Sequence, residues 1–301
     1  MRTAFINELI RQSRLNPRLF LVVGDLGFSV VEPFATEFPE RYLNAGVAEQ
    51  NMTSVAAGLA SEGYHVFTYS IANFPTLRCL EQIRNDVCYH NLPVTVVAVG
   101  AGLAYGNAGY THHGVQDLAV MRTLPNITVL SPADPGETIG CMRNLCENPR
   151  PSYLRLGKAG ERPLHDMSGL ERGPLAIKPA RSRLALAATG SITAVALDAA
   201  TEIKNRFGME IAVYSCPWLK PVTQEFFSPL WEHPCLLTLE EHVGAGGFGD
   251  LLRSLQPGPC RIKSLSVREE NSGLVGSQEF LRASSGLSVE AVVESAREIL
   301  V

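Results

Sequence analysis

The chain has 301 residues, of which 46% are hydrophobic and 19% are charged, and its mean hydropathy is +0.06. This composition is typical of a globular protein with about two domains. The net charge is −4 and the pI is near 6.0, so the chain has no basic excess of the kind that nucleic-acid-binding proteins carry. We therefore expect no nucleic-acid partner.

Membrane insertion and export are also not expected. No apolar run approaches the roughly 18 residues that a membrane-spanning helix needs, and residues 1–4 do not begin a signal peptide. The seven cysteines are scattered without a C-x-x-C pair, which predicts reduced thiols in a cytoplasmic protein. The seven histidines show no zinc-site spacing, so we expect no metal to be bound by this chain alone.

Short apolar strands alternate with longer helical stretches in the first half of the chain. Continuous apolar runs of this kind predict a parallel sheet that is covered on both faces. The predicted strands are 18–23, 93–100, 127–130 and 153–156, and the predicted helices are 44–63, 77–89 and 135–146. Asn44 is expected to cap the first of these helices and Gly63 to end it.

Prolines and glycines interrupt this alternation over residues 160–183 and predict a linker. The alternation then resumes, with predicted strands at 184–188, 211–215, 236–239 and 262–267 and predicted helices at 192–207 and 289–300. We therefore expect two stacked α/β domains with mostly parallel sheets, which comprise residues 1–165 and 166–301.

Gly244, Gly246 and Gly249 form a literal G-x-G-x-x-G between a predicted strand and a predicted helix. Glu269 and Glu270 follow about twenty residues later, where a dinucleotide site places its ribose-binding acid. However, too few residues follow this motif for the βα units of a dinucleotide fold. Close packing at a tight turn explains the glycines equally well, so NAD binding is the weaker interpretation.

Two further segments contain candidate catalytic residues. Glu49 lies in the first turns of an Ala-rich helix. A carboxylate that is buried there costs free energy unless it is paired with another group or has a functional role. It can equally be an acid that the helix dipole stabilises. His112 and His113 lie in a glycine-rich loop after a predicted strand, where α/β proteins often build sites. The side chains of two adjacent histidines cannot point the same way, so at most one of them is expected to face an active site.

Together these segments resemble the C-terminal half of transketolase, which is a pyrimidine-binding domain followed by a C-terminal domain. The resemblance spans nearly the whole chain and includes the G-V-A-E-Q of 46–50 and the T-H of 111–112. The other matching segments are Arg2, 24–26, Ser29, 74–78, 81–84, 121–126, 131–134 and 220–221. It implies thiamine diphosphate as the cofactor and cofactor-binding roles for Glu49, Phe74, Asp25 and Ile71.

In this family the matching glutamate hydrogen-bonds N1′ of the aminopyrimidine, and the matching aromatic, here Phe74, stacks on that ring. Ile71 stands where a second aromatic is common. The resemblance implies that Glu49 and His112 are catalytic and that Arg2, Ser29, His112 and Lys158 bind the substrate. The non-catalytic alternatives are a core phenylalanine at 74, a frayed end at Arg2 and a solvated lysine at 158.

The G-D-G…N motif that binds the diphosphate and Mg²⁺ in this family has no counterpart here. The resemblance therefore implies that the chain is the β subunit of a split enzyme, with both groups held by an α subunit in an α2β2 assembly. Such an enzyme transfers a two-carbon ketol unit from a ketose to an aldehyde, so its other partners are sugars or sugar phosphates.

Two departures from the family pattern concern the substrate. Ala108 replaces an aspartate that hydrogen-bonds a substrate hydroxyl in this family. Gly100 stands where a phosphate-contacting histidine is expected. We therefore expect a non-standard sugar substrate. The alternatives are a deoxyxylulose-phosphate synthase-like enzyme, the β subunit of a 2-oxoacid dehydrogenase E1, and a non-catalytic regulatory homologue.

Overall fold

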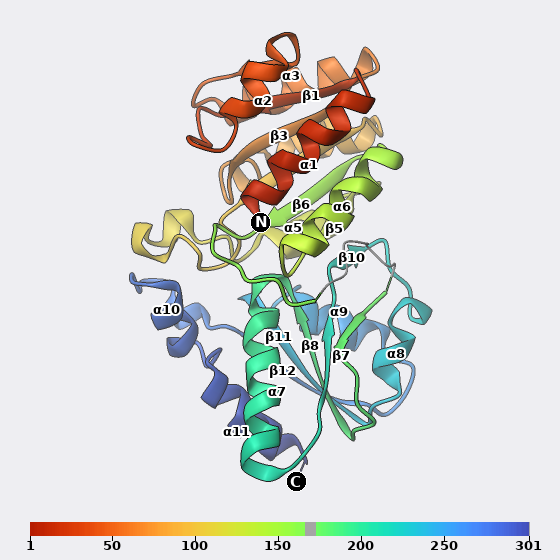
Figure 1. Ribbon diagram of the computed structural model, residues 1–301, viewed down its shortest axis with the longest axis vertical. Coiled ribbons are helices and arrows are strands. Elements are labelled where there is room, and N and C mark those ends of the chain that lie inside the picture. Colours follow the sequence, from red (N-terminus) through yellow and green to blue (C-terminus); the bar gives the residue numbers. More distant parts are fainter. Residues whose placement is uncertain (166–172, 301) are drawn as a thin grey trace.

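The computed structural model describes residues 1–165 and 173–300, which form two stacked α/β units (Figure 1). The first unit contains a seven-stranded sheet with the order β10-β5-β6-β4-β3-β1-β2. Its strands are β1 (Leu19–Val23), β2 (Tyr42–Asn44), β3 (His65–Ile71), β4 (Val94–Val99), β5 (Thr128–Leu130), β6 (Ser152–Leu156) and β10 (Trp218–Lys220). Its helices are α1 (Arg2–Leu15), α2 (Glu32–Glu37), α3 (Glu49–Ser61), α4 (Leu80–Gln82), α5 (Asp117–Thr123) and α6 (Pro135–Glu147).

This sheet is parallel except for β10, and it is buried on both faces. Every residue of β4 is buried, as expected for a strand between two layers of helices. The apolar side chains of α1 and α6 cover one face, and those of α3 cover the other. The carboxyl ends of β1, β3 and β4 consequently lie at one edge, where the loops that follow them meet.

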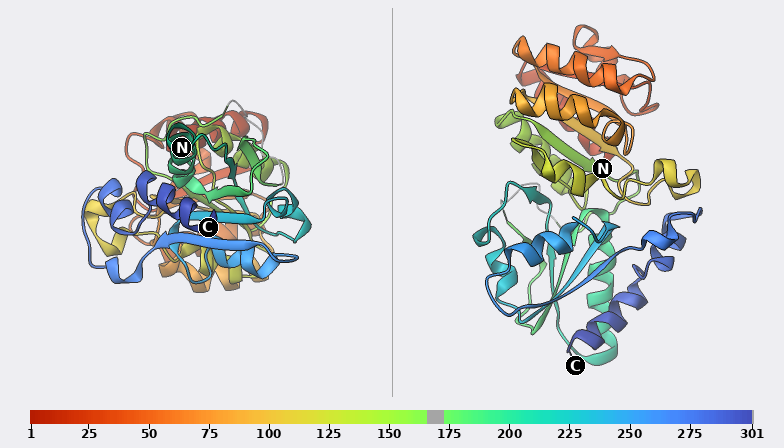
Figure 2. Two further views of the ribbon diagram at one scale, coloured as in Figure 1. Left: turned by 90° about the horizontal axis from the view of Figure 1, so that it is seen from below. Right: turned by 180° about the vertical axis from the view of Figure 1, so that it is seen from behind.

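The second unit contains a five-stranded sheet with the order β12-β11-β8-β9-β7. Its strands are β7 (Leu175–Lys178), β8 (Leu184–Thr189), β9 (Ala212–Ser215), β11 (Cys235–Val243) and β12 (Arg261–Val267). Its helices are α7 (Thr193–Phe207), α8 (Ser228–Trp231), α9 (Phe248–Leu255), α10 (Gln278–Ser284) and α11 (Val289–Leu300). Helices α7 and α11 lie side by side on one face of this sheet (Figure 2).

The predicted fold class is confirmed, because both sheets are mostly parallel and covered by helices. Several local predictions were wrong. Helix α3 begins at Glu49 with Ala48 as its N-cap, so Asn44 does not cap it. Residues 160–183 are not only a linker, because β7 pairs antiparallel with β9. The predicted boundary at 165/166 adjoins undescribed residues, among them Gly169 of the predicted linker, and it stays a prediction.

One strand connects the two units through the first sheet. β10 follows β9 in the chain but pairs antiparallel with β5. Lys220 of this strand donates to the carbonyl oxygens of Arg122, at 2.8 Å, and of Leu124. Arg122 in turn donates to the Gly246 carbonyl in the turn before α9, at 2.6 Å. Arg122 and Lys220, which belong to the matching segments, therefore join the two units.

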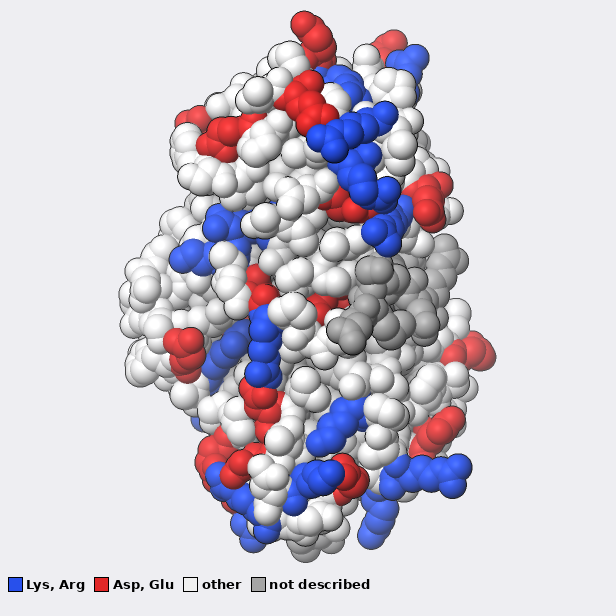
Figure 3. Space-filling view, viewed as in Figure 1, with Lys and Arg blue, Asp and Glu red and all other residues white. Residues whose placement is uncertain are grey.

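The described helices include none that is both long and apolar enough to cross a membrane. On the face seen in Figure 3, acidic and basic side chains are interspersed over both units. All seven cysteines are free thiols, and five of them are buried. Burial raises the pKa of Cys141 and Cys216 well above the ordinary thiol value, so these thiols stay protonated.

A buried arginine holds the interface between the units. Arg155 on β6 is 2% exposed and donates to the Asp117 carboxylate at 2.7 Å. It also donates to the carbonyl oxygens of Gly114, at 2.7 Å, and of Glu241 on β11, at 2.9 Å. Burial raises the pKa of Asp117, but the charges of Arg155 and His242 and the hydrogen bonds from Arg155 and Tyr153 together outweigh burial and leave that pKa below its ordinary value.

We expect Arg155→Met to lower the free energy of unfolding by about 3–5 kcal/mol, because Asp117 would remain buried without its counter-ion. The lowered pKa of Asp117 means that the pair stabilises the fold at neutral pH. This stabilisation is lost as the pH falls through the pKa of Asp117. Chemical denaturation measures both effects. The control is Arg14→Met, which removes an exposed ion pair with Glu37 and should change stability little. Equal losses in the two variants would contradict this role of Arg155.

Candidate functional site

Glu49 is a buried carboxylate at the start of α3, and its side chain is 1% exposed. Its Oε2 accepts from Arg78 Nη1 at 2.6 Å, and its Oε1 accepts from the Ser70 hydroxyl at 3.3 Å. Gly24, after β1, lets the backbone approach this carboxylate, because a Cβ there would lie 3.3 Å from Glu49 Cγ. The strands β1 and β3 thus end beside an acid that is held in a nearly dry environment.

Arg78, the partner of Glu49, is accessible to solvent. The Arg78 side chain is 43% exposed, and its guanidinium carbon lies 4.6 Å from the centre of the Phe74 ring. Phe74 is half-buried in the turn after β3. Arg78 therefore covers both the face of Phe74 and one oxygen of Glu49. Rotation of this exposed side chain would uncover an aromatic face next to a carboxylate.

The two neighbouring histidines point in different directions, as the sequence analysis expected. His112 packs edge-on against Phe74 with ring centres 5.2 Å apart, and its Nδ1 lies 3.0 Å from the Thr111 hydroxyl. His113 is 3% exposed, and its Nε2 lies 3.4 Å from the Gly106 carbonyl. Only His112 therefore reaches the aromatic group beside Glu49.

Tyr105 connects His112 to a lysine. Its ring centre is 6.4 Å from that of His112, and the Lys158 ammonium lies 4.9 Å from the ring centre on its face. The same ring lies directly over Gly100, where a Cβ would come within 2.1 Å of Tyr105 Cδ2. Side-chain contacts therefore run continuously from Glu49 through Arg78, Phe74, His112 and Tyr105 to Lys158.

The remaining predicted site residues surround this series. Asp25 and Ser29 are exposed in the loop after β1, with φ angles of 57° and 62°. Asp25 exchanges two hydrogen bonds with Asn44, so Asn44 orders this loop instead of capping α3. Ile71 is the last residue of β3, shortly before Phe74 in the chain, and Arg2 is the first residue of α1. Their proposed contacts with cofactor or substrate stay predictions.

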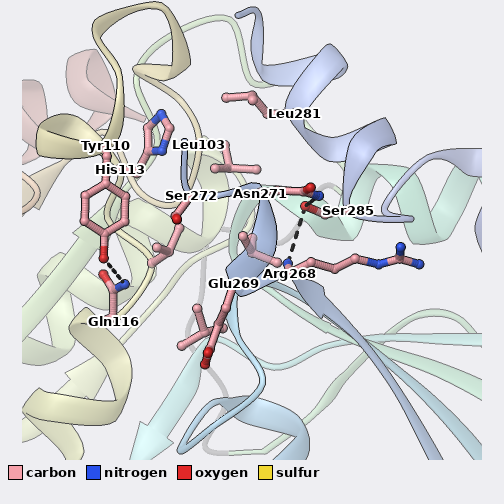
Figure 4. Close-up of a pocket in the computed structure, with 13 residues that line it drawn as sticks. Leu103, Tyr110, His113, Gln116, Arg268, Glu269, Asn271, Ser272, Leu281 and Ser285 are labelled. Carbon is pink, nitrogen blue, oxygen red and sulfur yellow. Dashed lines mark hydrogen bonds between the residues drawn. The ribbon is translucent and has the colours of Figure 1, made fainter. Parts of the chain in front are cut away.

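A pocket of about 420 Å³ lies behind the His112 loop, between the two units (Figure 4). Tyr110 and His113 line it from the first unit, and Asn271 and Ser285 line it from the second. Neither Glu49 nor Phe74 lines this pocket. The loop that carries His112 therefore has the candidate catalytic groups on one side and this cavity on the other.

The G-x-G-x-x-G segment forms the turn between β11 and α9, but backbone N–H groups of this turn already donate hydrogen bonds within the protein. The Glu240 carboxylate accepts from the backbone N–H of Phe248 at 2.6 Å and of Gly249 at 2.9 Å. A Cβ on Gly247 would lie 2.2 Å from Glu240 Oε2, so this glycine gives the carboxylate room. An internal carboxylate thus occupies the place of a dinucleotide phosphate, which argues against NAD binding.

Asp134, Glu137 and His165 bring three possible metal-ligating atoms within 4.8 Å of one another. Their oxygens already have protein partners. Asp134 accepts from the backbone N–H of Glu137 and Leu164, and Glu137 accepts from that of Ala133. This cluster caps the N-terminus of α6.

The sequence analysis missed two side chains of this series. Arg78 was part of a matching segment without a role of its own, and Tyr105 was not singled out at all. The signal for Tyr105 was Gly100, because a missing side chain in a buried site leaves room that another group fills. Only the fold shows that the group is a tyrosine five residues away.

The transketolase pyrimidine-binding domain model matches residues 1–161, and the transketolase C-terminal domain model matches residues 173–257. The chain belongs to the transketolase family. The B subunit of apulose-4-phosphate transketolase from Actinobacillus succinogenes is 30% identical, and the match covers 92% of this chain and 90% of that protein. The protein of the same name from Phocaeicola vulgatus is 29% identical, over 99% of this chain and 97% of that protein.

A solved split-gene transketolase, described as an inactive β4 tetramer, has the same fold. Its TM-score is 0.86 at 31% identity, and the match covers 99% of this chain and 97% of that one. The 1-deoxy-D-xylulose-5-phosphate synthase of Desulforudis audaxviator is 32% identical, but the chain matches only 47% of its length. This transketolase-type transferase therefore corresponds to the β subunit of a split enzyme. The family depends on thiamine diphosphate.

Gly100 is expected to be essential for the packing of Tyr105 in this transketolase chain. Gly100 and Gly63 have φ angles of +89° and +88°, but only Gly100 has a close neighbour, since no heavy atom lies within 4 Å of a Cβ on Gly63. Gly63→Ala should destabilise by about 1–2 kcal/mol through backbone strain alone. Gly100→Ala should cost about 1–3 kcal/mol more, because its Cβ collides with the Tyr105 ring. Denaturant titration of both variants measures the difference, and equal losses would refute this packing.

Proposed function

We propose that this chain joins an α subunit, as α2β2, to form a thiamine-diphosphate-dependent ketol transferase. The observation that carries the proposal is Glu49, a buried carboxylate beside an aromatic face and the His112 ring. Relatives of nearly the same length, each named as one subunit of a transketolase, support a separate partner. In this proposal the partner binds the diphosphate and Mg²⁺, because the family motif for both groups has no counterpart here.

The residues present fit the aminopyrimidine end of the cofactor. The half-exposed Arg78 covers one oxygen of Glu49, and Phe74 offers a flat face next to it. When bound, thiamine diphosphate supplies the carbon nucleophile that carries the two-carbon unit. Glu49 holds a hydrogen bond at N1′ of the ring, in a site where little water competes. Phe74 fixes the plane of the ring by stacking.

In this proposal His112 serves the substrate end of the same site. It lies between Phe74 and Tyr105, so its imidazole faces the space between the ring site and Lys158. There it would hydrogen-bond substrate oxygens and move a proton at the carbon atoms that react. Arg2 and Lys158 would bind a phosphate at the far end, and Ser29 would add a hydroxyl from the loop after β1.

We further propose that the substrate is not a standard pentose phosphate, and apulose 4-phosphate is the first candidate. Two relatives carry that compound in their names. Ala108, exposed in the loop before His112, offers no hydrogen bond to a substrate hydroxyl, and Gly100 offers no side chain. A site without these groups does not discriminate against substrates that lack their partners. Ketol transfer to standard pentose and heptose phosphates at a rate near that of an ordinary transketolase would refute this.

A deoxyxylulose-phosphate synthase-like reaction is the second candidate, because such synthases match the chain at 32% identity. The two reactions differ in their donors. A synthase-like enzyme releases carbon dioxide from a 2-oxoacid, whereas a ketol transferase does not. Carbon dioxide measurement with pyruvate as the donor therefore separates them.

We expect Glu49→Gln to lower the ketol-transfer rate of the assembled enzyme by about 10²–10⁴-fold, since the amide cannot hold the proton at N1′. The matched control is Glu62→Gln, an exposed position just after the same helix, which should leave the rate unchanged. A coupled assay with co-expressed α subunit measures both variants. A Glu49→Gln enzyme with nearly full activity would contradict the assignment.

A further inference from the structure

The loop between β4 and α5, which carries His112, rests on the second unit. Its middle lies beside α10 (Figure 1). A Cβ on Gly106 would come within 2.5 Å of the Gly276 carbonyl oxygen and of Leu281 Cδ1. The Gly276 N–H also donates to the Gly106 carbonyl at 3.3 Å. The loop is therefore packed against a segment that belongs to the other unit.

This contact continues to His112 within the loop. The His112 N–H donates to the Gly109 carbonyl at 2.9 Å, and a Cβ on Gly109 would lie 3.5 Å from Val275 Cγ2 of the second unit. From the first unit, the Asn73 amide donates to the carbonyl oxygens of the residues on either side of His112, at 3.2 and 2.8 Å. His112 is thus held between one first-unit side chain and the second-unit surface.

Helix α10 is too short to keep this position through its own stability. It has seven residues, and within this fully described helix Leu281 alone is buried. Helices of this length are marginal without tertiary contacts. Its other contact with the interior is ionic, because Arg282, with a side chain that is 16% exposed, pairs with Glu241 on β11, which is 3% exposed.

The Glu241 carboxylate binds two side chains of α10. Arg282 donates from Nε to Oε1 at 2.8 Å and from Nη2 to Oε2 at 3.1 Å, and Gln278 Nε2 lies 3.0 Å from both oxygens. Burial raises the pKa of Glu241, but the charge of Arg282, the hydrogen bonds from both side chains and the charge of Arg155 leave that pKa below its ordinary value. Glu241 also packs on the start of the loop, where a Cβ on Gly102 would lie 2.4 Å from Glu241 Cβ.

We propose that Glu241 is a positioning residue, which holds α10 against the loop and thereby fixes His112 at the substrate. This rests on the proposed function, in which His112 moves a proton at the carbon atoms that react. A displacement of about 1 Å can slow such a step about 100-fold, because proton transfer depends on the distance between the groups. The second unit, which supplies none of Glu49, Phe74 and His112, thus acts on the reaction through this contact.

The first test measures hydrogen exchange in the full chain and needs no activity. Glu241→Gln keeps the shape of the side chain but turns one acceptor into an NH2 group that faces other donors. We expect the backbone amides of residues 102–114 and 276–285 to exchange about tenfold faster, because these segments open more easily. Gln278→Ala removes two hydrogen bonds without leaving a buried charge unpaired, so it should give a smaller increase in the same segments. Unchanged exchange in the loop of both variants would overturn the proposal.

Two controls separate this effect from a general loss of stability. Glu279→Gln makes the same charge change at an exposed position of the same helix and should leave exchange unchanged. Leu252→Ala in α9 removes a buried side chain from a different apolar cluster of the second unit. It should lower the melting temperature of the chain and leave the kcat of the assembled enzyme unchanged.

The second test measures ketol transfer by the assembled enzyme. Glu241→Gln should lower kcat about tenfold with little change in KM or in the affinity for thiamine diphosphate, because the first unit holds Glu49 and Phe74. The loss should disappear in a His112→Ala background, since the residue that Glu241 positions is then absent. A structural role that does not act through His112 would instead lower kcat by the same factor in both backgrounds.

A folded Glu241→Gln enzyme with normal kcat, or an equal loss in both backgrounds, would overturn the proposal. If Glu241→Gln does not fold, Gln278→Ala takes its place in the same comparison, with an expected loss in kcat of about threefold. If exchange in the loop rises as described but the wild-type complex transfers no ketol unit, the proposed function fails, whereas the support of the loop by Glu241 stands.

Discussion

The structure depends on one fully buried guanidinium. Arg155 projects from the first sheet into the interface and bonds to Asp117, to the Gly114 carbonyl and to the Glu241 carbonyl of the second sheet. A charge without water is tolerated only when such partners surround it. Gly114 lies two residues beyond His112, and Gly102 packs so closely on Glu241 that a Cβ there would lie 2.4 Å from Glu241 Cβ. The loop that presents His112 is therefore held by the contact that joins the two units.

The carboxylate at the other end of the site is held differently. Glu49 is buried, but the arginine that pairs with it is 43% exposed and rests on Phe74. Water solvates the exposed arginine once it moves, but the buried carboxylate then needs another hydrogen-bond partner in its place. The site thus combines a rigid support beneath His112 with a displaceable partner for Glu49. This suits the proposal that a separate polypeptide completes a ring-binding site here.

The sequence correctly predicted the elements whose local hydrophobic pattern matches their burial in the folded protein. Residues 94–99 form the expected strand because a run of β-branched residues fits a sheet buried on both faces. Strand β3 was missed because His65, Thr68 and Ser70 interrupt its apolar pattern, although the fold buries all three. β10 could not be predicted either, because a strand of three residues is defined by its pairing with β5 across the two units.

For the site, the resemblance indicated Glu49, Phe74 and His112, and the fold brings these three together. The pairing of Arg78 with Glu49 and the packing of Tyr105 on Gly100 depend on tertiary contacts that spacing does not reveal. The glycine-rich turn before α9 shows the opposite case. Its sequence matches the G-x-G-x-x-G motif letter by letter. However, the Glu240 carboxylate accepts the hydrogen bonds from the backbone N–H groups that a phosphate would need.

The most direct test of this account is calorimetric titration of thiamine diphosphate with Mg²⁺ into the chain alone and into its complex with the α subunit. The account predicts saturable binding to the complex, no comparable binding to the chain alone, and loss of binding in the Phe74→Ala complex. Equally tight binding by the chain alone would contradict the shared site. Binding to a complex that tolerates Phe74→Ala would contradict the ring site built on Glu49 and Phe74.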